Sequence, residues 1–268
     1  MTLPAYEVLA IRYATRPARR VANFVGGDPH DVDMPMDYFV WSIRDARRTV
    51  VVDTGFAHDM AVKRHRTLLR TPREAFALVG IDTAAVADVI ITHFHNDHVG
   101  TFDTFDRATF HVQDDEMAFT TGRMMLHEQF SRPYEPDHVA GLIRLVYEDR
   151  VEFHDGDGEV APGISVHRIG GHTAGLQVVR VHTARGWVVL ASDASHYYEH
   201  FERGRVFPLV HHMGETIDGY RRLRQLASSP RHVVPGHDPL VLERYPAPSE
   251  ALRGIVARLD ADPVDGTR

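Results

Sequence analysis

Three histidines and an aspartate lie within six consecutive residues, His93-Phe94-His95-Asn96-Asp97-His98. They directly follow residues 87–92, an apolar stretch with the pattern of a short buried strand. Imidazole and carboxylate groups are the ligands of borderline divalent ions such as Zn²⁺. Because a strand end is rigid and the turn after it can aim alternate side chains at one point, this spacing predicts a preorganised metal site.

Three later segments place further ligand-type residues at the ends of apolar stretches. His172 follows Gly171, Asp193 follows residues 187–192, and His237 follows Gly236. Glycine before such a residue permits a tight turn and a close approach of the backbone to a site. The chain has no cysteine, which excludes disulfide scaffolds and zinc sites built on thiolate.

The elements that must position these residues alternate between the two classes of secondary structure. Strands are expected at residues 6–13, 37–43, 48–53, 87–92, 164–169, 177–181, 187–192 and 232–234, and helices at 59–70, 71–79, over most of 114–146, and at 215–227. A loop at 26–35 is long enough to reach across a site mouth. We expect an α+β protein, an αββα sandwich of two packed mixed β-sheets flanked by helices, with residues 1–268 as one domain.

The composition and charge of the chain limit the kinds of molecule that it can bind. The chain has 268 residues, of which 43% are hydrophobic and 25% charged, as in globular proteins. Its formal net charge of −7 disfavours a nucleic-acid partner. No signal peptide and no apolar run of the roughly 18 residues that span a bilayer is visible, so we expect a cytoplasmic protein without a membrane partner. Lys63 is the only lysine, which indicates a bias toward arginine in the genome.

These motifs together resemble the metallo-β-lactamase superfamily, whose mark is His-x-His-x-Asp-His followed by a distant His, an Asp and a last His. The resemblance runs from Asp53 to His237 and implies the metallo-β-lactamase fold. It implies that a first metal is bound by His93, His95 and His172, a second by Asp97, His98 and His237, and both by Asp193. It also implies that Asp53 orients the ligands without binding metal itself.

Two divalent ions would supply hydrolytic chemistry. We expect two Zn²⁺ per chain, with Fe or Mn as alternatives, sharing a hydroxide that attacks an ester carbonyl at neutral pH. Asp97 is placed to carry a proton to the leaving oxygen.

The N-acyl-homoserine lactonase branch is the most similar one, because Asp193-Ala194-Ser195 follows a similar strand. Where those lactonases generally carry a tyrosine that touches the substrate carbonyl, this chain has His196, with Tyr197 next to it. Either His196 takes over the contact, or a shift of one residue brings Tyr197 to it, or both only pack under the following loop. The expected substrate is a small molecule, a lactone or related cyclic ester, with N-acyl-homoserine lactone as one candidate.

The sequence leaves the role of some residues and the choice between several functions undecided. Phe24, His211 and His212 are candidates for contacts with the substrate, and a homodimer is compatible with the sequence. Three alternative functions are possible on the same fold: a mononuclear iron dioxygenase, a thioesterase, and a metal-bound protein that recognises a small ligand without turnover. Metal analysis separates the first of these from a two-zinc hydrolase.

Overall fold

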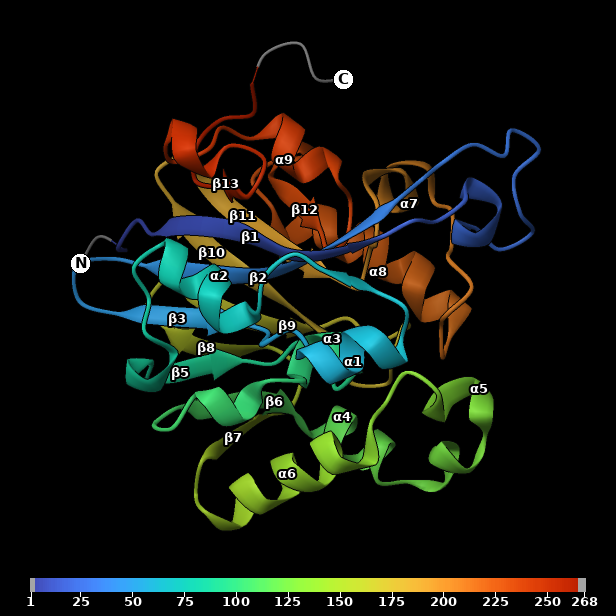
Figure 1. Ribbon diagram of the computed structural model, residues 1–268, viewed down its shortest axis with the longest axis horizontal. Helices are drawn as coiled ribbons and strands as arrows, with labels where there is room; N and C mark the ends of the chain where they lie inside the picture. The colour runs from blue at the N-terminus through green and yellow to red at the C-terminus, as the bar shows by residue number, and fades with distance from the viewer. Residues whose placement is uncertain (1–2, 265–268) are drawn as a thin grey trace.

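Two β-sheets form the centre of the computed structural model, which describes residues 3–264 (Figure 1). The larger sheet has eight strands in the order β13-β1-β2-β3-β5-β6-β7, with β4 paired to β1. Its strands are β1 (Glu7–Arg16), β2 (Met36–Arg44), β3 (Thr49–Val52), β4 (Thr67–Leu68), β5 (Asp88–Ile90), β6 (Thr109–Gln113), β7 (Val151–His154) and β13 (Val256–Arg258). The smaller sheet has the order β12-β11-β10-β9-β8, with strands β8 (Gly158–Ala161), β9 (Ile164–Arg168), β10 (Gln177–Thr183), β11 (Gly186–Ser192) and β12 (Val233–Pro235).

Both sheets are mixed. Strands β3, β5, β6 and β7 run parallel to one another, as do β11 and β12, while the other pairs are antiparallel. The carboxyl ends of neighbouring parallel strands meet at one edge of a sheet, which is where α/β proteins bind ligands.

Helices flank the two sheets on their outer sides. They are α1 (His58–Lys63), α2 (Pro72–Leu78), α3 (Asn96–Val99), α4 (Asp114–Thr120), α5 (Glu128–Ser131), α6 (Pro136–Tyr147), α7 (Tyr198–Arg203), α8 (Met213–Leu226) and α9 (Leu240–Arg244). Apolar side chains of α2 and α6 pack on the larger sheet, and those of α7 and α8 pack with the smaller one. None of the helices within residues 3–264 has the length and apolarity to cross a bilayer.

Strand β2 shows how one strand serves two apolar layers. Phe39 and Trp41 belong to the cluster between the sheets, whereas Tyr38 and Val40 belong to the cluster under the outer helices. This follows from the alternation of side chains along a strand, and all four side chains are buried. The expected α+β sandwich of two mixed sheets is confirmed.

Residues 59–70 differ from the expected helix. Helix α1 ends at Lys63, His65 takes a left-handed conformation with φ of 53°, and Thr67 and Leu68 pair with β1 as β4. An L-residue with positive φ cannot continue a right-handed helix, so the chain turns there. The next expected helix begins as predicted, because Thr71 and Glu74 form a capping box at α2. Strands β6, β7, β8 and β13 and helices α3, α7 and α9 were not predicted from the sequence.

Candidate metal centre

Strand ends from both sheets bring the candidate ligands together at one edge of the sandwich. His93, His95 and His98 lie in the turn after β5 and in the short helix α3. The later ligand candidates follow β9, β11 and β12 of the smaller sheet. We call these residues the histidine–aspartate cluster; its members are His93, His95, Asp97, His98, His172, Asp193 and His237.

Two glycines allow this convergence. Gly171 has φ of +82°, and a Cβ atom there would lie 2.5 Å from the Oγ1 atom of Thr216. A Cβ atom on Gly236 would lie 2.7 Å from the carbonyl oxygen of Ser192. Both distances are too short for a side chain, so glycine is required where the turns before His172 and His237 pass other backbone.

The first half of the cluster contains three imidazoles and one carboxylate. The Nδ1 atom of His95 lies 3.0 Å from the Nε2 atoms of both His93 and His172. The Oδ2 atom of Asp193 lies 3.2 Å from His172 Nε2 and 3.7 Å from His93 Nε2. One ligand atom from each of these four buried residues lies within 4.8 Å of the others, so the group could hold a metal ion.

The second half shares Asp193 with the first. The Oδ1 atom of Asp193 lies 2.9 Å from His237 Nε2 and 3.5 Å from His98 Nε2. The Oδ2 atom of Asp97 lies 3.9 Å from His98 Nε2, and these residues with His237 form another group that could hold a metal ion. Asp193 thus presents one oxygen to each half.

Hydrogen bonds behind the cluster set the tautomers of its histidines. His98 Nδ1 donates to Asp53 Oδ2 at 2.7 Å, and His237 Nδ1 donates to the carbonyl of Asp37 at 2.8 Å. His172 Nδ1 likewise donates to the carbonyl of Leu209 at 2.6 Å. A neutral imidazole that donates through Nδ1 keeps a free lone pair on Nε2, the atom that faces the cluster in all three residues.

The donor set therefore fits divalent metal. His98 Nε2 and Asp193 Oδ1 are buried and make no hydrogen bond within the described residues, although buried polar atoms are normally paired. Asp53 lies behind His98 and also accepts from the backbone N–H and the hydroxyl of Thr92, both at 2.8 Å. Its oxygens are thus directed at Thr92 and His98.

Burial and neighbouring charges control ionisation in the cluster. Burial, reinforced by neighbouring imidazoles, lowers the pKa of His93 and His95 well below the usual value, which keeps both neutral. For His98, burial opposes charging, but Asp53 and Asp193 dominate and raise its pKa well above the usual value, so a metal ion bound at its Nε2 atom would displace a proton. Burial would raise the pKa of Asp193, yet the surrounding histidines, His237 first, hold it well below the usual range.

The sequence pattern of the metallo-beta-lactamase superfamily matches residues 33–237, which include the whole cluster. This match covers most of the chain. The chain belongs to the metallo-beta-lactamase superfamily. Membership and the geometry of the cluster together support a divalent metal at this site.

Several proteins of known name are similar to this superfamily member. N-acyl homoserine lactonase AttM of Azorhizobium caulinodans is 28% identical over 237 residues, which cover 80% of this chain and 85% of that protein. N-acyl homoserine lactonase AiiB of Agrobacterium fabrum is 28% identical over 230 residues, with coverage of 77% and 80%.

Solved structures show the same fold. A quorum-quenching N-acyl homoserine lactone lactonase superposes with a TM-score of 0.72 at 20% identity, over 89% of this chain and 93% of that one. An N-acyl homoserine lactone hydrolase with the product N-hexanoyl-L-homoserine at its catalytic metal centre has a TM-score of 0.70 at 19% identity, over 89% and 94%.

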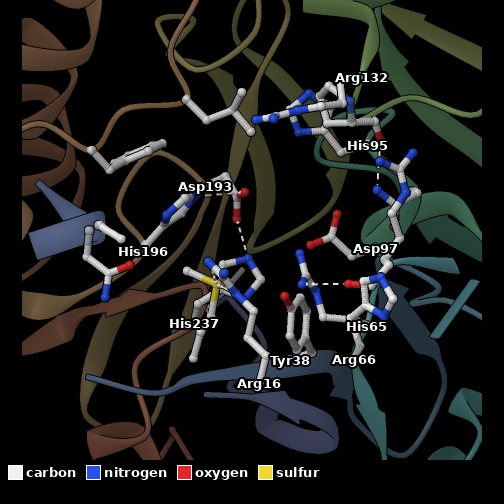
Figure 2. Close-up of a pocket in the computed structure, with 18 of the residues that line it drawn as sticks. Arg16, Tyr38, His65, Arg66, His95, Asp97, Arg132, Asp193, His196 and His237 are labelled. Carbon is white, nitrogen blue, oxygen red and sulfur yellow. Dashed lines mark hydrogen bonds and ion pairs between the residues drawn. The ribbon is translucent and has the colours of Figure 1, made fainter. Parts of the chain in front are cut away.

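A cavity of about 500 Å³ opens beside the cluster of this metallo-beta-lactamase superfamily member (Figure 2). His95, Asp97, Asp193, His196 and His237 line it. His196 Nε2 lies 3.1 Å from Asp193 Oδ2, and its ring stacks on Phe207 with centroids 3.7 Å apart. Burial lowers the pKa of His196 to about 3, so its imidazole is neutral at pH 7.

Four other sequence candidates do not line this cavity. Tyr197 is buried, and its hydroxyl donates to the carbonyl of Met34 at 3.1 Å. Phe24 is buried against the ring of His200. The ring of His211 packs against Phe119, and His212 caps helix α8 by accepting from the backbone N–H of Glu215. Tyr197 and Phe24 are thus enclosed by protein, His211 is half-buried, and His212 is exposed away from the cavity.

Sequence reasoning missed two features of the site. Tyr38 lines the cavity, and its ring packs against His237. The aromatic and apolar pattern of its strand predicts only that the side chain is buried. Glu116, in the first turn of α4, accepts hydrogen bonds from the backbone N–H of Phe94 at 2.9 Å and from the hydroxyl of Thr173 at 2.5 Å. Glu116 thereby connects the turns that carry His95 and His172. No local sequence motif predicts this role.

Proposed function

We propose that this chain is a dinuclear metal-dependent hydrolase that opens a lactone or related cyclic ester, with two Zn²⁺ per chain. The observation that carries the proposal is the placement of Asp193, which directs one carboxylate oxygen toward each half of the cluster. Relatives named N-acyl homoserine lactonase support lactones as the substrate class. Packing between both sheets supports the further proposal that residues 1–268 form one domain.

The cluster would hold the metals through the halves already described, His93, His95 and His172 on one side and Asp97, His98 and His237 on the other. Such a pair of ions polarises an ester carbonyl and makes water nucleophilic at neutral pH. Asp53 keeps His98 in its binding tautomer, and Asp193 joins the two halves.

Asp97 is the proposed proton carrier. It lines the cavity, and its side chain is 19% exposed, unlike the fully buried imidazoles next to it. A carboxylate at the boundary between cluster and cavity can take a proton from the attacking water and deliver it through Oδ2 to the leaving alkoxide. Ring opening requires this delivery because an alkoxide is a poor leaving group.

His196 and Tyr38 are the proposed contacts for the substrate. His196 is neutral and lines the cavity beside Asp193, so it can offer a polar contact without adding charge. Burial raises the pKa of Tyr38 above its usual value, with Arg66 opposing, so its phenol keeps its proton and can donate to a carbonyl oxygen. In Figure 2 the two side chains lie on either side of His237. Tyr197 serves instead to anchor the N-terminal loop through its hydroxyl.

A lactone panel measured by proton release in a pH-stat tests the proposal. The zinc-loaded protein should open lactones of some ring size and acyl length, and removal of metal by a chelator should abolish this activity. Absence of proton release across lactones, esters and thioesters would contradict hydrolysis. One iron per chain with oxygen uptake would instead indicate a dioxygenase, and turnover of thioesters alone a thioesterase.

A further inference from the structure

The cavity beside the cluster carries positive charge that the chain as a whole does not. Acidic residues outnumber basic ones by 37 to 30. Among the residues that line the cavity, however, Asp97 and Asp193 are the carboxylates, and both belong to the cluster. The basic side chains that line it are Arg16, Lys63, Arg64, Arg66 and Arg132.

Two of these basic residues are already neutralised. Lys63 Nζ lies 2.6 Å from an oxygen of Glu135, and Arg64 pairs with the other oxygen of the same carboxylate. The remaining three, Arg16, Arg66 and Arg132, form no ion pair with any residue between 3 and 264. Their charges are thus available to a ligand in the cavity.

The unpaired arginines come from three separate segments. Arg16 ends β1, Arg66 follows the left-handed turn at His65, and Arg132 follows α5. Figure 2 shows Arg132 on one side of the cavity and Arg16 and Arg66 on the other, with Asp97 between them.

Local contacts hold two of these guanidinium groups without using all their donors. Arg66 Nη1 donates to the carbonyl of Arg64 at 2.8 Å, and its guanidinium lies 5.7 Å from the ring centroid of Tyr38. Arg16 contacts the sulfur of Met36 at 3.4 Å. A guanidinium carries five N–H donors, so each arginine keeps several for an anion.

We propose that Arg16, Arg66 and Arg132 receive a carboxylate or phosphate group of the substrate, so that the site takes a compact anionic lactone or cyclic ester. The inference rests on the proposed hydrolase function and specifies its substrate class. Guanidinium groups match the oxygens of carboxylate and phosphate, often with two parallel hydrogen bonds. An alkyl chain in the same place would remove these donors from water without replacing their hydrogen bonds.

A matched pair of substrates tests the inference with the zinc-loaded enzyme. The pair is 5-oxotetrahydrofuran-3-carboxylate and its neutral carboxamide, which differ in charge and little in size. We expect kcat/KM to favour the carboxylate by about tenfold or more, as for a charge-assisted hydrogen bond. Added salt should raise KM for the carboxylate more than for the carboxamide.

Variants assign the preference to the arginines. Arg66→Gln and Arg132→Gln should each reduce the ratio of carboxylate to carboxamide kcat/KM by about tenfold, mainly through KM. The control Arg107→Gln, an exposed residue that does not line the cavity, should leave the ratio unchanged. Inhibition by succinate and by inorganic phosphate then separates the two anions, since the matching one should lose more affinity in the variants.

The possible failures differ in what they overturn. Equal kcat/KM for the two lactones in the wild-type enzyme, or a ratio that the arginine variants leave unchanged, would overturn the anionic substrate while leaving the hydrolase intact. Inhibition by both anions that is identical in wild type and variants would overturn it as well. No hydrolysis of either lactone or of the broad panel would overturn the proposed function and this inference together.

Discussion

His196 is the third residue after Asp193, where the resemblance to the lactonases implies a tyrosine, and its surroundings decide what it can do there. Its ring is fixed by stacking on Phe207, and its Nε2 atom lies 3.1 Å from Asp193 Oδ2. Asp193, His196 and His237 also form a group that could hold metal. His196 could therefore contact substrate or metal, and substitution distinguishes these roles.

We expect His196→Phe to lower kcat by about 10- to 100-fold and to leave the zinc content unchanged, because the variant loses a polar contact but keeps the stacking. Turnover of lactone and metal analysis on the same samples measure both. The control His127→Phe, at an exposed position, should change neither. Loss of zinc would identify His196 as a ligand, and unchanged turnover would show that it only packs.

The ends of strands, as elements, account for most of what the sequence predicts about the site. Each candidate ligand follows an apolar stretch, and the chain after such a stretch has few ways to turn, so spacing alone brings out His93, His172 and Asp193. The prediction of one helix over residues 59–70 was wrong, because the turn at His65 depends on the pairing of β4 with β1. The local sequence does not encode that contact.

Gly171→Ala tests how strictly the turn before His172 is built. The substitution places a Cβ atom 2.5 Å from Thr216 Oγ1 at a φ of +82°, so we expect a loss of about 3 kcal/mol in the free energy of unfolding and weaker zinc binding. Gly80→Ala is the matched control, because Gly80 has φ of +75° with open space around it. It should cost about 1 kcal/mol. Equal losses in urea unfolding would show that no close approach constrains Gly171.

Helix α7 holds the N-terminal loop through a buried histidine. His200 Nε2 donates to the carbonyl of Asn23 at 3.0 Å, and its ring packs against Phe24. Burial lowers the pKa of His200 to about 4, so the folded protein binds fewer protons than the unfolded chain between pH 6.5 and pH 4. The stability that neutral His200 contributes is complete above pH 6.5 and is lost as the pH falls toward 4.

We therefore expect wild type to lose about 2 kcal/mol more unfolding free energy than His200→Gln between pH 7 and pH 5. Glutamine retains a donor and an acceptor but does not titrate, and the other histidines contribute equally to both proteins. Urea unfolding at the two pH values measures the difference. Identical losses would show that His200 is protonated as readily in the folded state as in the unfolded one.

At the scale of the whole molecule, the cluster joins the two sheets. Its motif residues from 93 to 98 come from the larger sheet, whereas His172, Asp193 and His237 come from the smaller one. The spacing of the motifs predicts this assembly, because every segment of the histidine–aspartate cluster follows the end of a strand. The arginines of the cavity could not be predicted, since Arg16, Arg66 and Arg132 lie far apart in the sequence and follow no shared pattern.

Metal content of the wild-type protein and of Asp193→Ala tests the central claim most directly. Asp193 lies within 4 Å of ligand atoms in both halves of the cluster, so its loss should disturb both sites. Elemental analysis should give about two zinc per wild-type chain and far less in Asp193→Ala, while the exposed control Asp106→Ala keeps the wild-type value. One metal per wild-type chain, or two zinc retained by Asp193→Ala, would contradict a dinuclear centre joined by Asp193.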